Sequence, residues 1–361
     1  MTSTAPGHDP GHASPPGFSW SDHVAWLVER QGSLAAVAER LAALRGYEDD
    51  AASVERALRR LRARGQQDGG TWGARVLAAF GLPEAVDARA RWMGAYHSRF
   101  TDLPVPLCQD LVRLWDRPPV SEAPAARVWL AIAHASCALR LADRDAAATH
   151  LRRARAVRAK APPEARIELL LAEAFVASRE DPTQVPALLA EAEPLLAHDM
   201  PAHDKACLHA RWIDQLAYER NKGRDGRAPD LAGSEALYRT IDVDSAPSFA
   251  RCRRASGLAY ARWKQGHRDE GAALAREACR HAGDGGHIRL RAMALSMVAR
   301  IVGGPEGAEA HSRALAIATD LEDEALRLRF ELRAGPRGLS AQKAAPRAAP
   351  APRSRLTGAA K

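Results

Sequence analysis

The sequence predicts an all-α protein, on three observations. Hydrophobic residues make up 46% of the 361 residues, which is enough for a sizeable core. Aromatic residues contribute only 5%, whereas the helix-favouring Ala, Leu, Arg and Glu recur throughout. Apolar residues also recur at helical spacing between short breaks rich in Gly and Pro. These features argue against a β-sandwich or barrel and exclude global disorder, and the length allows two or three domains.

Differences in amino-acid composition divide the chain into four regions. Residues 1–18, rich in Pro, Gly and His, are expected to be a disordered leader. Residues 19–122 hold five of the eight tryptophans and predict a compact helical N-terminal module. Residues 123–333 contain Ala-rich stretches of similar length, which predict stacked helix hairpins. Residues 334–361, rich in Ala, Pro and Arg, predict a disordered basic tail.

Positive charge is unevenly distributed along the chain. The formal net charge is +8, from 52 Lys and Arg against 44 Asp and Glu. Residues 334–361 hold six basic residues and no acidic one, and residues 53–64 hold five arginines and one glutamate. The net charge of the whole chain is therefore weak evidence for a nucleic-acid partner. The local charge of residues 53–64 is better evidence.

Three short helices are expected within residues 19–65. In the last of them, Val54, Leu58 and Leu61 share one face at i, i+4 and i+7. The opposite face carries arginines at four positions: Arg56, Arg59, Arg60 and Arg64. A helix that is anchored by an apolar stripe and basic outside suits duplex DNA, where guanidinium groups contact phosphates and guanine edges. The alternative is a basic face that is merely solvated.

Residues 33–65 resemble a helix-turn-helix, in the style of bacterial winged-helix regulators. In that family a small residue in the second helix, a turn glycine and a branched aliphatic residue early in the recognition helix hold the helices at their angle. Ala42, Gly46 and Val54 match these roles. Residues 66–73 are the segment that could form the wing hairpin. The resemblance implies DNA contact by Ser53, Arg56, Arg59, Arg60 and Arg64.

Residues 74–117 are expected to contribute core, and could also line a ligand cleft. Trp92, Tyr96 and Phe100 are spaced i, i+4 and i+8, which predicts that they share one helix face. A second amphipathic helix is expected after Pro106, ending before Pro118. Such an aromatic stripe more often belongs to a core than to a binding site.

Residues 123–333 are predicted to fold as about five helix hairpins and a final helix. Breaks rich in Pro and Gly separate the helical stretches. The predicted pairs are 123–141 with 145–160, 163–179 with 183–198, 201–221 with 230–240, 246–265 with 268–282, and 287–302 with 305–319, followed by a helix at 321–333.

One unit of this region resembles a tetratricopeptide repeat, in which a glycine closes the first helix and small residues recur where two antiparallel helices approach closely. The residues that carry the resemblance are Leu258, Tyr260, Trp263, Gly266, Gly271, Ala275 and Ala278. The resemblance implies a right-handed α-solenoid whose groove binds a protein or peptide partner. It implies partner contact by Trp129, Ser136, Arg253, Ser256, Tyr260 and Trp263. The alternative is that Tyr260 and Trp263 pack between hairpins.

No catalytic signature is evident, and no enzyme activity, cofactor or metal is expected. The five cysteines stand far apart and leave an odd one over, which predicts reduced thiols rather than disulfides or a zinc ribbon. Residues 69–73 lack the Lys-Ser/Thr of a phosphate-binding loop. Residues 198–209 contain His and Asp at spacings that could ligate a metal. The preferences of His and Asp for helix ends explain the same residues.

The sequence predicts a cytoplasmic protein with no membrane partner. Residues 1–17 show no secretory signal, and the longest apolar run, 167–177, is interrupted by Glu168 and Glu173. The predicted function is a non-enzymatic transcriptional regulator that binds DNA through the N-terminal module and a protein or peptide partner through the solenoid. A homodimer is compatible with this prediction. The alternative is an interaction scaffold of the same fold that does not bind DNA.

Overall fold

A computed structural model describes residues 17–44, 49–223 and 228–334 of the chain. Within these residues the protein forms seventeen α-helices and no strand, which confirms the predicted all-α class. The predicted leader and basic tail lie outside the described residues, apart from Gly17, Phe18 and Ala334. None of the helices in the described ranges is both long and apolar enough to cross a membrane.

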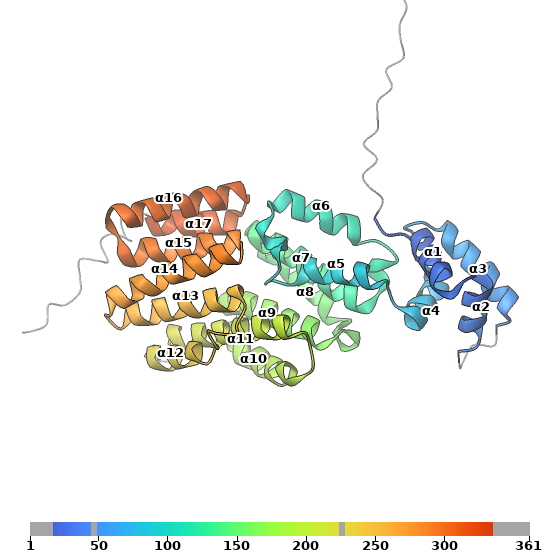
Figure 1. Cartoon of the computed structure of the whole chain (residues 1–361), viewed down its shortest axis with the longest axis horizontal. Helices are drawn as coiled ribbons and strands as arrows, with labels where there is room; N and C mark the ends of the chain where they lie inside the picture. The colour runs from blue at the N-terminus through green and yellow to red at the C-terminus, as the bar shows by residue number, and fades with distance from the viewer. Residues whose placement is uncertain (1–16, 45–48, 224–227, 335–361) are drawn as a thin grey trace, which may run out of the picture.

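The first four helices form an N-terminal lobe, which we define as residues 17–82. The lobe lies at one end of the elongated molecule (Figure 1). Three of these helices begin directly after a residue whose side chain accepts a hydrogen bond from a free backbone N–H group of the first turn. Ser19 caps α1, Ser33 caps α2 and Asp50 caps α3. The four helices are α1 (Trp20–Gln31), α2 (Leu34–Ala42), α3 (Ala51–Ala63) and α4 (Gly70–Phe80).

Residues 66–73, the segment that could have formed a wing hairpin, instead turn and begin α4. The indole of Trp20 donates a hydrogen bond to the carbonyl oxygen of Gln67 at 3.1 Å. Gly69 and Gly73 lie against the same indole so closely that a Cβ atom on Gly69 would come within 2.3 Å of it. The glycines thus allow the start of a helix to pack on Trp20, and no hairpin forms in this segment.

The remaining helices form a helical body, which we define as residues 83–334. It begins with α5 (Glu84–Gly94) and α6 (Val105–Trp115), both packed on α7 (Pro124–Arg140). At the contact of α5 with α7, a Cβ atom on Gly94 would approach the carbonyl oxygen of Trp129 to 2.5 Å. The body therefore includes residues that the sequence texture had grouped with the N-terminal module.

The predicted stripe of Trp92, Tyr96 and Phe100 on one helix is wrong. Helix α5 ends at Gly94, and the backbone of Ala95 is extended. Tyr96 and Phe100 lie in the next segment, and Phe100 belongs to the 3₁₀ turn η1 (Arg99–Asp102). We call residues 95–104 the crossing segment, because they contact α11, α13 and α15 as well as α5.

Five consecutive helix pairs follow, close to the bounds predicted from Pro and Gly breaks. Each pair packs together along the body (Figure 1). The first pair is α7 with α8 (Arg144–Arg155), and α8 is shorter than expected. The second pair is α9 (Pro163–Glu180) with α10 (Val185–Ala192), and a 3₁₀ turn lies on each side of α10. The others are α11 (Ala202–Lys222) with α12 (Leu231–Arg239), α13 (Ser248–Lys264) with α14 (Arg268–Asp284), α15 (Ile288–Val302) with α16 (Gly304–Asp320), and the final helix is α17 (Glu324–Ala334).

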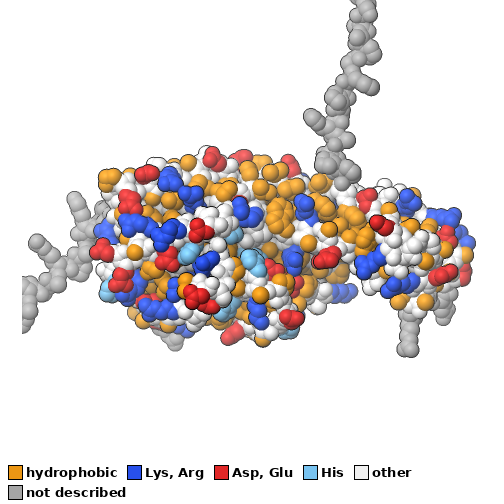
Figure 2. Space-filling view, viewed as in Figure 1, with side chains coloured by type: hydrophobic (Ala, Val, Ile, Leu, Met, Phe, Trp, Pro, Cys, Tyr) orange, Lys and Arg blue, Asp and Glu red, His pale blue; other side chains and the backbone are white. Residues whose placement is uncertain are grey.

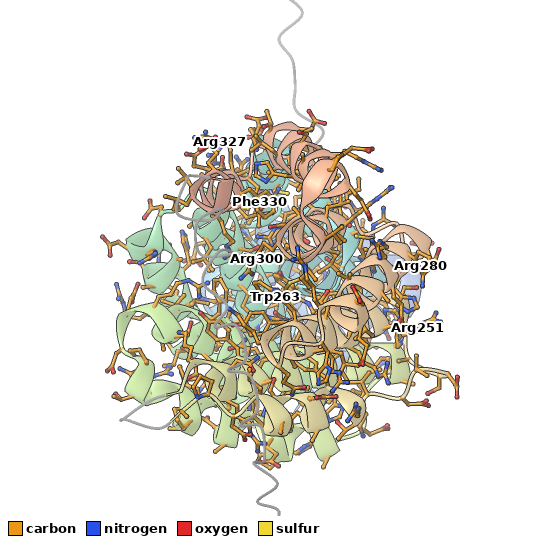
Figure 3. The ribbon with its side chains drawn as sticks, turned by 90° about the vertical axis from the view of Figure 1, so that its left-hand side faces the viewer. Arg251, Trp263, Arg280, Arg300, Arg327 and Phe330 are labelled. Atoms are coloured by element: carbon orange, nitrogen blue, oxygen red, sulfur yellow. The ribbon has the colours of Figure 1, made fainter. Side chains whose placement is uncertain are left out.

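The last helix of the body packs back on its first pair. Helix α17 contacts α7, and the backbone N–H of Val105 donates to the carbonyl oxygen of Leu321 at 3.0 Å. Arg140 of α7 and Asp323, directly before α17, form a buried ion pair at 3.1 Å. Seen along the body, Arg300 and Trp263 lie near the centre, and Arg251 and Arg280 lie toward the outside (Figure 3). The interior of the body is therefore enclosed by helices from both ends of the array.

Candidate DNA-contacting face and ligand pocket

Helix α3 of the N-terminal lobe presents the predicted arginine face to solvent. Its apolar stripe of Val54, Leu58 and Leu61 is buried against α1, α2 and α4. On the outer end of the lobe, basic side chains lie beside acidic ones (Figure 2). The four predicted arginines are all exposed: Arg56, Arg59, Arg60 and Arg64.

Some of these arginines have partners within their own part of the chain. Arg56 donates to the hydroxyl of Ser53 at 2.8 Å, and that hydroxyl donates to the carboxylate of Asp50. Arg59 pairs with Glu55 one turn earlier, at 2.5 Å, and Arg64 donates to the carbonyl oxygen of Asp68. Arg60 makes no hydrogen bond or ion pair with any described residue. Ser53 bonds mainly to Asp50 at the start of the helix, and its link to the predicted arginine face is the hydrogen bond that it accepts from Arg56.

The acidic turn before α3 is partly neutralised. Asp49 pairs with Arg75 of α4 at 2.6 Å. Asp50 accepts from the backbone N–H of Ser53 at 2.8 Å, and the hydrogen bonds from Ser53 lower the pKa of Asp50. Glu48, together with the predicted turn glycine Gly46, lies outside the described residues.

The second candidate site is a pocket of about 470 Å³ inside the helical body. The crossing segment and helices α5, α7, α9, α11, α12, α13, α15 and α17 line it. Its walls include eight cationic side chains, from Arg140, Arg179, Arg211, Lys222, Arg253, Arg289, Arg300 and Arg329. Only three carboxylates line the same pocket, those of Glu168, Asp214 and Glu219.

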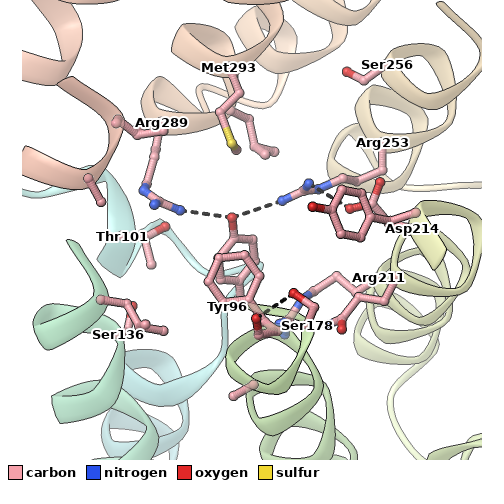
Figure 4. A pocket seen from close by; sticks show the side chains of 18 of the residues that line it. Tyr96, Thr101, Ser136, Ser178, Arg211, Asp214, Arg253, Ser256, Arg289 and Met293 are labelled. Carbon is pink, nitrogen blue, oxygen red and sulfur yellow. Dashed lines mark hydrogen bonds and ion pairs between the residues drawn. The ribbon is translucent and has the colours of Figure 1, made fainter. Parts of the chain in front are cut away.

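Tyr96 of the crossing segment lies at the centre of this cationic pocket. Its hydroxyl oxygen accepts from Arg253 at 3.0 Å and from Arg289 at 2.9 Å (Figure 4). The guanidinium of Arg211 lies 4.4 Å from the centre of its ring, a cation–π contact. Burial raises the pKa of Tyr96, but the arginines Arg289, Arg253 and Arg211 outweigh it and lower the pKa to about 8. The pocket thus favours a negative charge at this point.

Carboxylates hold the inner arginines in place without matching their number. Arg211 pairs with Glu168, and Arg253 pairs with Asp214 at 3.1 Å. Arg289 pairs with Asp323 at 2.7 Å, and the same oxygen of Asp323 also accepts from Arg140 at 3.1 Å. A single buried carboxylate therefore serves two guanidinium groups.

Two further arginines of the pocket have no carboxylate partner among the described residues. Arg179 donates to the carbonyl oxygen of Phe175 at 2.8 Å and to the hydroxyl of Ser178, and it lies 3.8 Å from the centre of the Phe175 ring. Arg329 makes no hydrogen bond or ion pair with the described part of the chain. Burial lowers the pKa of both arginines. Repulsion by Arg329 lowers that of Arg179 further, and repulsion by Arg289 lowers that of Arg329.

The predicted partner-contacting residues separate into two groups. Ser136, Arg253, Ser256 and Tyr260 line the pocket. Trp263 is half-buried beside Tyr260, with Lys264 4.5 Å and Arg300 5.0 Å from its ring centre.

For Trp129, the structure corrects the prediction of partner contact. Only 2% of its surface is exposed, and it packs against Gly94 of α5 rather than lining the pocket. Trp129 lies on the side of α7 that faces α5. The sequence analysis groups α5 with the N-terminal module, so repeat spacing alone does not show that α5 covers this position.

The sequence did not single out several pocket residues. Tyr96 was expected in a core stripe, and Arg289 and Arg329 carried no local signal because their neighbours in space come from distant helices. For example, the side chain of Arg99 donates a hydrogen bond to the carbonyl oxygen of Gly285 at 3.2 Å, although 186 positions of the sequence separate the two residues.

A possible metal-binding group lies where the crossing segment meets α11. One ligand atom from each of His97, His203 and Cys207 lies within 4.8 Å of the others, a donor set that suits zinc. The carboxylate of Asp204 accepts a hydrogen bond from His97 at 2.9 Å, and Arg91 lies 3.6 Å from the same carboxylate. Burial raises the pKa of the Cys207 thiol to about 12. The sequence had placed a metal candidate in residues 198–209 but had no means to find His97.

Comparisons with known proteins add no relative. No family model, curated protein or solved structure matches the chain. The helix-turn-helix and tetratricopeptide resemblances therefore remain predictions, and the function is inferred from the two sites described above.

Proposed function

We propose that the protein is a non-enzymatic transcriptional regulator. Helix α3 of the N-terminal lobe binds duplex DNA, and the pocket of the helical body binds a protein or peptide partner. The observation that carries the proposal is the exposed arginine face of α3, whose opposite face is buried against the rest of its lobe.

The geometry of α3 supports contact with a phosphate backbone. Arg56 and Arg60 lie one helical turn apart, so their side chains project from the same side of the helix. Arg60 has no partner to release among the described residues, and Arg56 gives up only one hydrogen bond to a hydroxyl. Both guanidinium groups are thus free to bind phosphate oxygens, with condensed counterions released from the DNA.

A continuous set of contacts connects the pocket with the N-terminal lobe. Glu122, two residues before the start of α7, accepts from the backbone N–H of Gly69 at 2.8 Å. Arg117 donates to Gln66 at 3.0 Å, and Gln66 donates to the carbonyl oxygen of Gly17. Helix α7 itself lines the pocket through Ser136 and Arg140. We propose that a partner bound in the pocket changes the orientation of the lobe through α7.

An interaction scaffold without DNA binding is the second candidate. It is favoured by the partners that Arg59 and Arg64 already have, Glu55 and the carbonyl oxygen of Asp68. In that case the arginine face is solvated and has no macromolecular ligand.

Binding of the full chain to a mixed-sequence DNA duplex at low salt separates the two candidates. We expect the Arg56→Ala/Arg60→Ala variant to bind about tenfold to a hundredfold more weakly in a fluorescence anisotropy titration, because two phosphate contacts are lost. A control variant, Arg153→Ala/Arg280→Ala, removes the same charge from exposed positions of the helical body. Equal loss in both variants, or no binding by the unmodified protein, would support the scaffold instead.

A further inference from the structure

We propose that the pocket of the helical body is a site for an organic anion, a compound that joins a carboxylate group to an apolar body. The inference rests on the proposed function, because it names the chemistry of the group that a partner places in the pocket. A short acidic peptide and a free organic acid share this chemistry.

The first step is the charge of the pocket. Eight cationic side chains line it against three carboxylates, and Asp323 adds a fourth carboxylate from outside the lining. Uncompensated charge in a partly enclosed cavity is costly, since burial disfavours the charged form. An anionic ligand would supply the missing charge.

The second step is the location of the missing charge. Asp323 is shared between Arg140 and Arg289, while Arg329 has no partner among the described residues. The Nε atom of Arg253 is buried and has no hydrogen-bond acceptor within residues 17–44, 49–223 and 228–334. Arg253 and Arg289 both point toward the Tyr96 hydroxyl from opposite sides (Figure 4). A carboxylate beside Tyr96 would find guanidinium donors from α13 and α15 already in position.

The third step is the remainder of the lining, which is apolar. The cavity of about 470 Å³ has the size of a typical small-molecule pocket. Its apolar wall includes Met93, Ile132, Leu139, Met293, Met297 and Phe330. Methionine side chains adapt to ligands of different shape. A small inorganic anion would leave this wall unoccupied, so the ligand must carry an apolar body.

The experiment compares acids with their neutral counterparts on the full chain without DNA. Isothermal titration calorimetry measures the binding of decanoate and of decanol, and of a short peptide of Leu and Glu and the same peptide with Gln in place of Glu. We expect at least one acid to bind about tenfold or more tightly than its neutral counterpart. The acid that binds identifies the source of the anion.

Two variants test whether the arginines are responsible. Arg329→Gln removes an unpaired charge, so we expect about tenfold weaker binding of the acid with the melting temperature of the ligand-free protein unchanged or raised. Arg280→Gln, on the outer side of α14 (Figure 3), is the matched control and should bind normally.

Three results would overturn the proposal. They are no binding of either acid, equal binding of acid and neutral compound, and unchanged binding by Arg329→Gln. The outcome is independent of DNA binding: the Arg56→Ala/Arg60→Ala variant should bind the acid normally even if α3 proves not to contact DNA.

Discussion

At the scale of single residues, Tyr96 shows how the pocket alters the chemistry of a side chain. The sequence placed it on a helix with Trp92 and Phe100, because spacing is all that one sequence provides. Because α5 ends at Gly94, Tyr96 lies in the crossing segment, where arginines from three helices surround it. Neither the early end of α5 nor the distant arginines leave a pattern around Tyr96 itself.

The ionisation of Tyr96 is the first testable consequence. Its pKa of about 8 lies below the usual 10, so the folded protein favours the ionised form. The resulting stabilisation is absent below pH 8, grows as pH rises and is complete above pH 10. A spectroscopic pH titration of tyrosinate absorbance should show one step near pH 8. That step should be missing in Tyr96→Phe; its persistence would assign it to another tyrosine.

His23 provides a second prediction, in the N-terminal lobe. Its ring is fully buried beside Phe18, Trp20 and Trp26, and neither ring nitrogen has a hydrogen-bond partner in the described part of the chain. Burial lowers the pKa of His23 from 6.5 to about 4. The unfolded chain therefore binds an extra proton between these values, and the free energy of unfolding should fall by about 3 kcal/mol as pH drops from 6.5 to 4.

Urea unfolding at several pH values checks this expectation. We expect His23→Leu to abolish this part of the pH dependence, because it removes the titrating group and keeps an apolar side chain. His198→Leu, at an exposed position, should behave like the unmodified protein. Equal pH dependence in all three proteins would show that His23 does not titrate as described.

At the scale of elements, the sequence predicts most helices of the body because Pro and Gly interrupt the chain where the helices end. Gly266, with φ of +95°, follows the end of α13 and allows the chain to turn there. The exceptions have local causes. Pro194 stands where α10 gives way to a 3₁₀ turn, and Gly69 and Gly73 allow α4 to start against Trp20. The contacts of glycines with distant side chains are not visible in a single sequence.

Helix α3 allows its packing face and its solvent face to be tested separately. Leu58 is fully buried, so Leu58→Ala should lower the free energy of unfolding by about 2–5 kcal/mol. Arg60→Ala, on the exposed face, should change it by no more than about 0.5 kcal/mol. Urea unfolding monitored by tryptophan fluorescence measures both variants. A large loss of stability in Arg60→Ala would mean that this arginine has a structural role.

At the scale of the whole molecule, the closure of the helical body depends on contacts that the sequence could not reveal. Asp323 lies 183 positions from Arg140, yet the two side chains form a buried ion pair that joins the start of α17 to α7. An open array of repeats would make contacts between neighbouring hairpins only. The return of α17 to α7, together with the crossing segment, converts an interior groove into the arginine-lined pocket.

Removal of Asp323 should open this closure. Asp323→Ala leaves Arg140 and Arg289 without their carboxylate, and we expect a loss of about 3–5 kcal/mol in the free energy of unfolding. Hydrogen exchange should become faster in α17 and in the crossing segment. Glu331→Ala, which breaks only a surface pair with Arg327, should cost less than about 1 kcal/mol. Similar exchange of α17 in both variants would refute the role of Asp323 in closure.

The most direct test of the central claim is the salt dependence of DNA binding. The affinity of the full chain for a mixed-sequence duplex is measured between about 50 and 200 mM salt, and its logarithm is plotted against the logarithm of salt concentration. If α3 contacts the phosphates, Arg56→Ala/Arg60→Ala should reduce the slope by about 2, and Arg153→Ala/Arg280→Ala should leave it unchanged. A slope that is the same in all three proteins would show that the arginine face of α3 does not bind DNA.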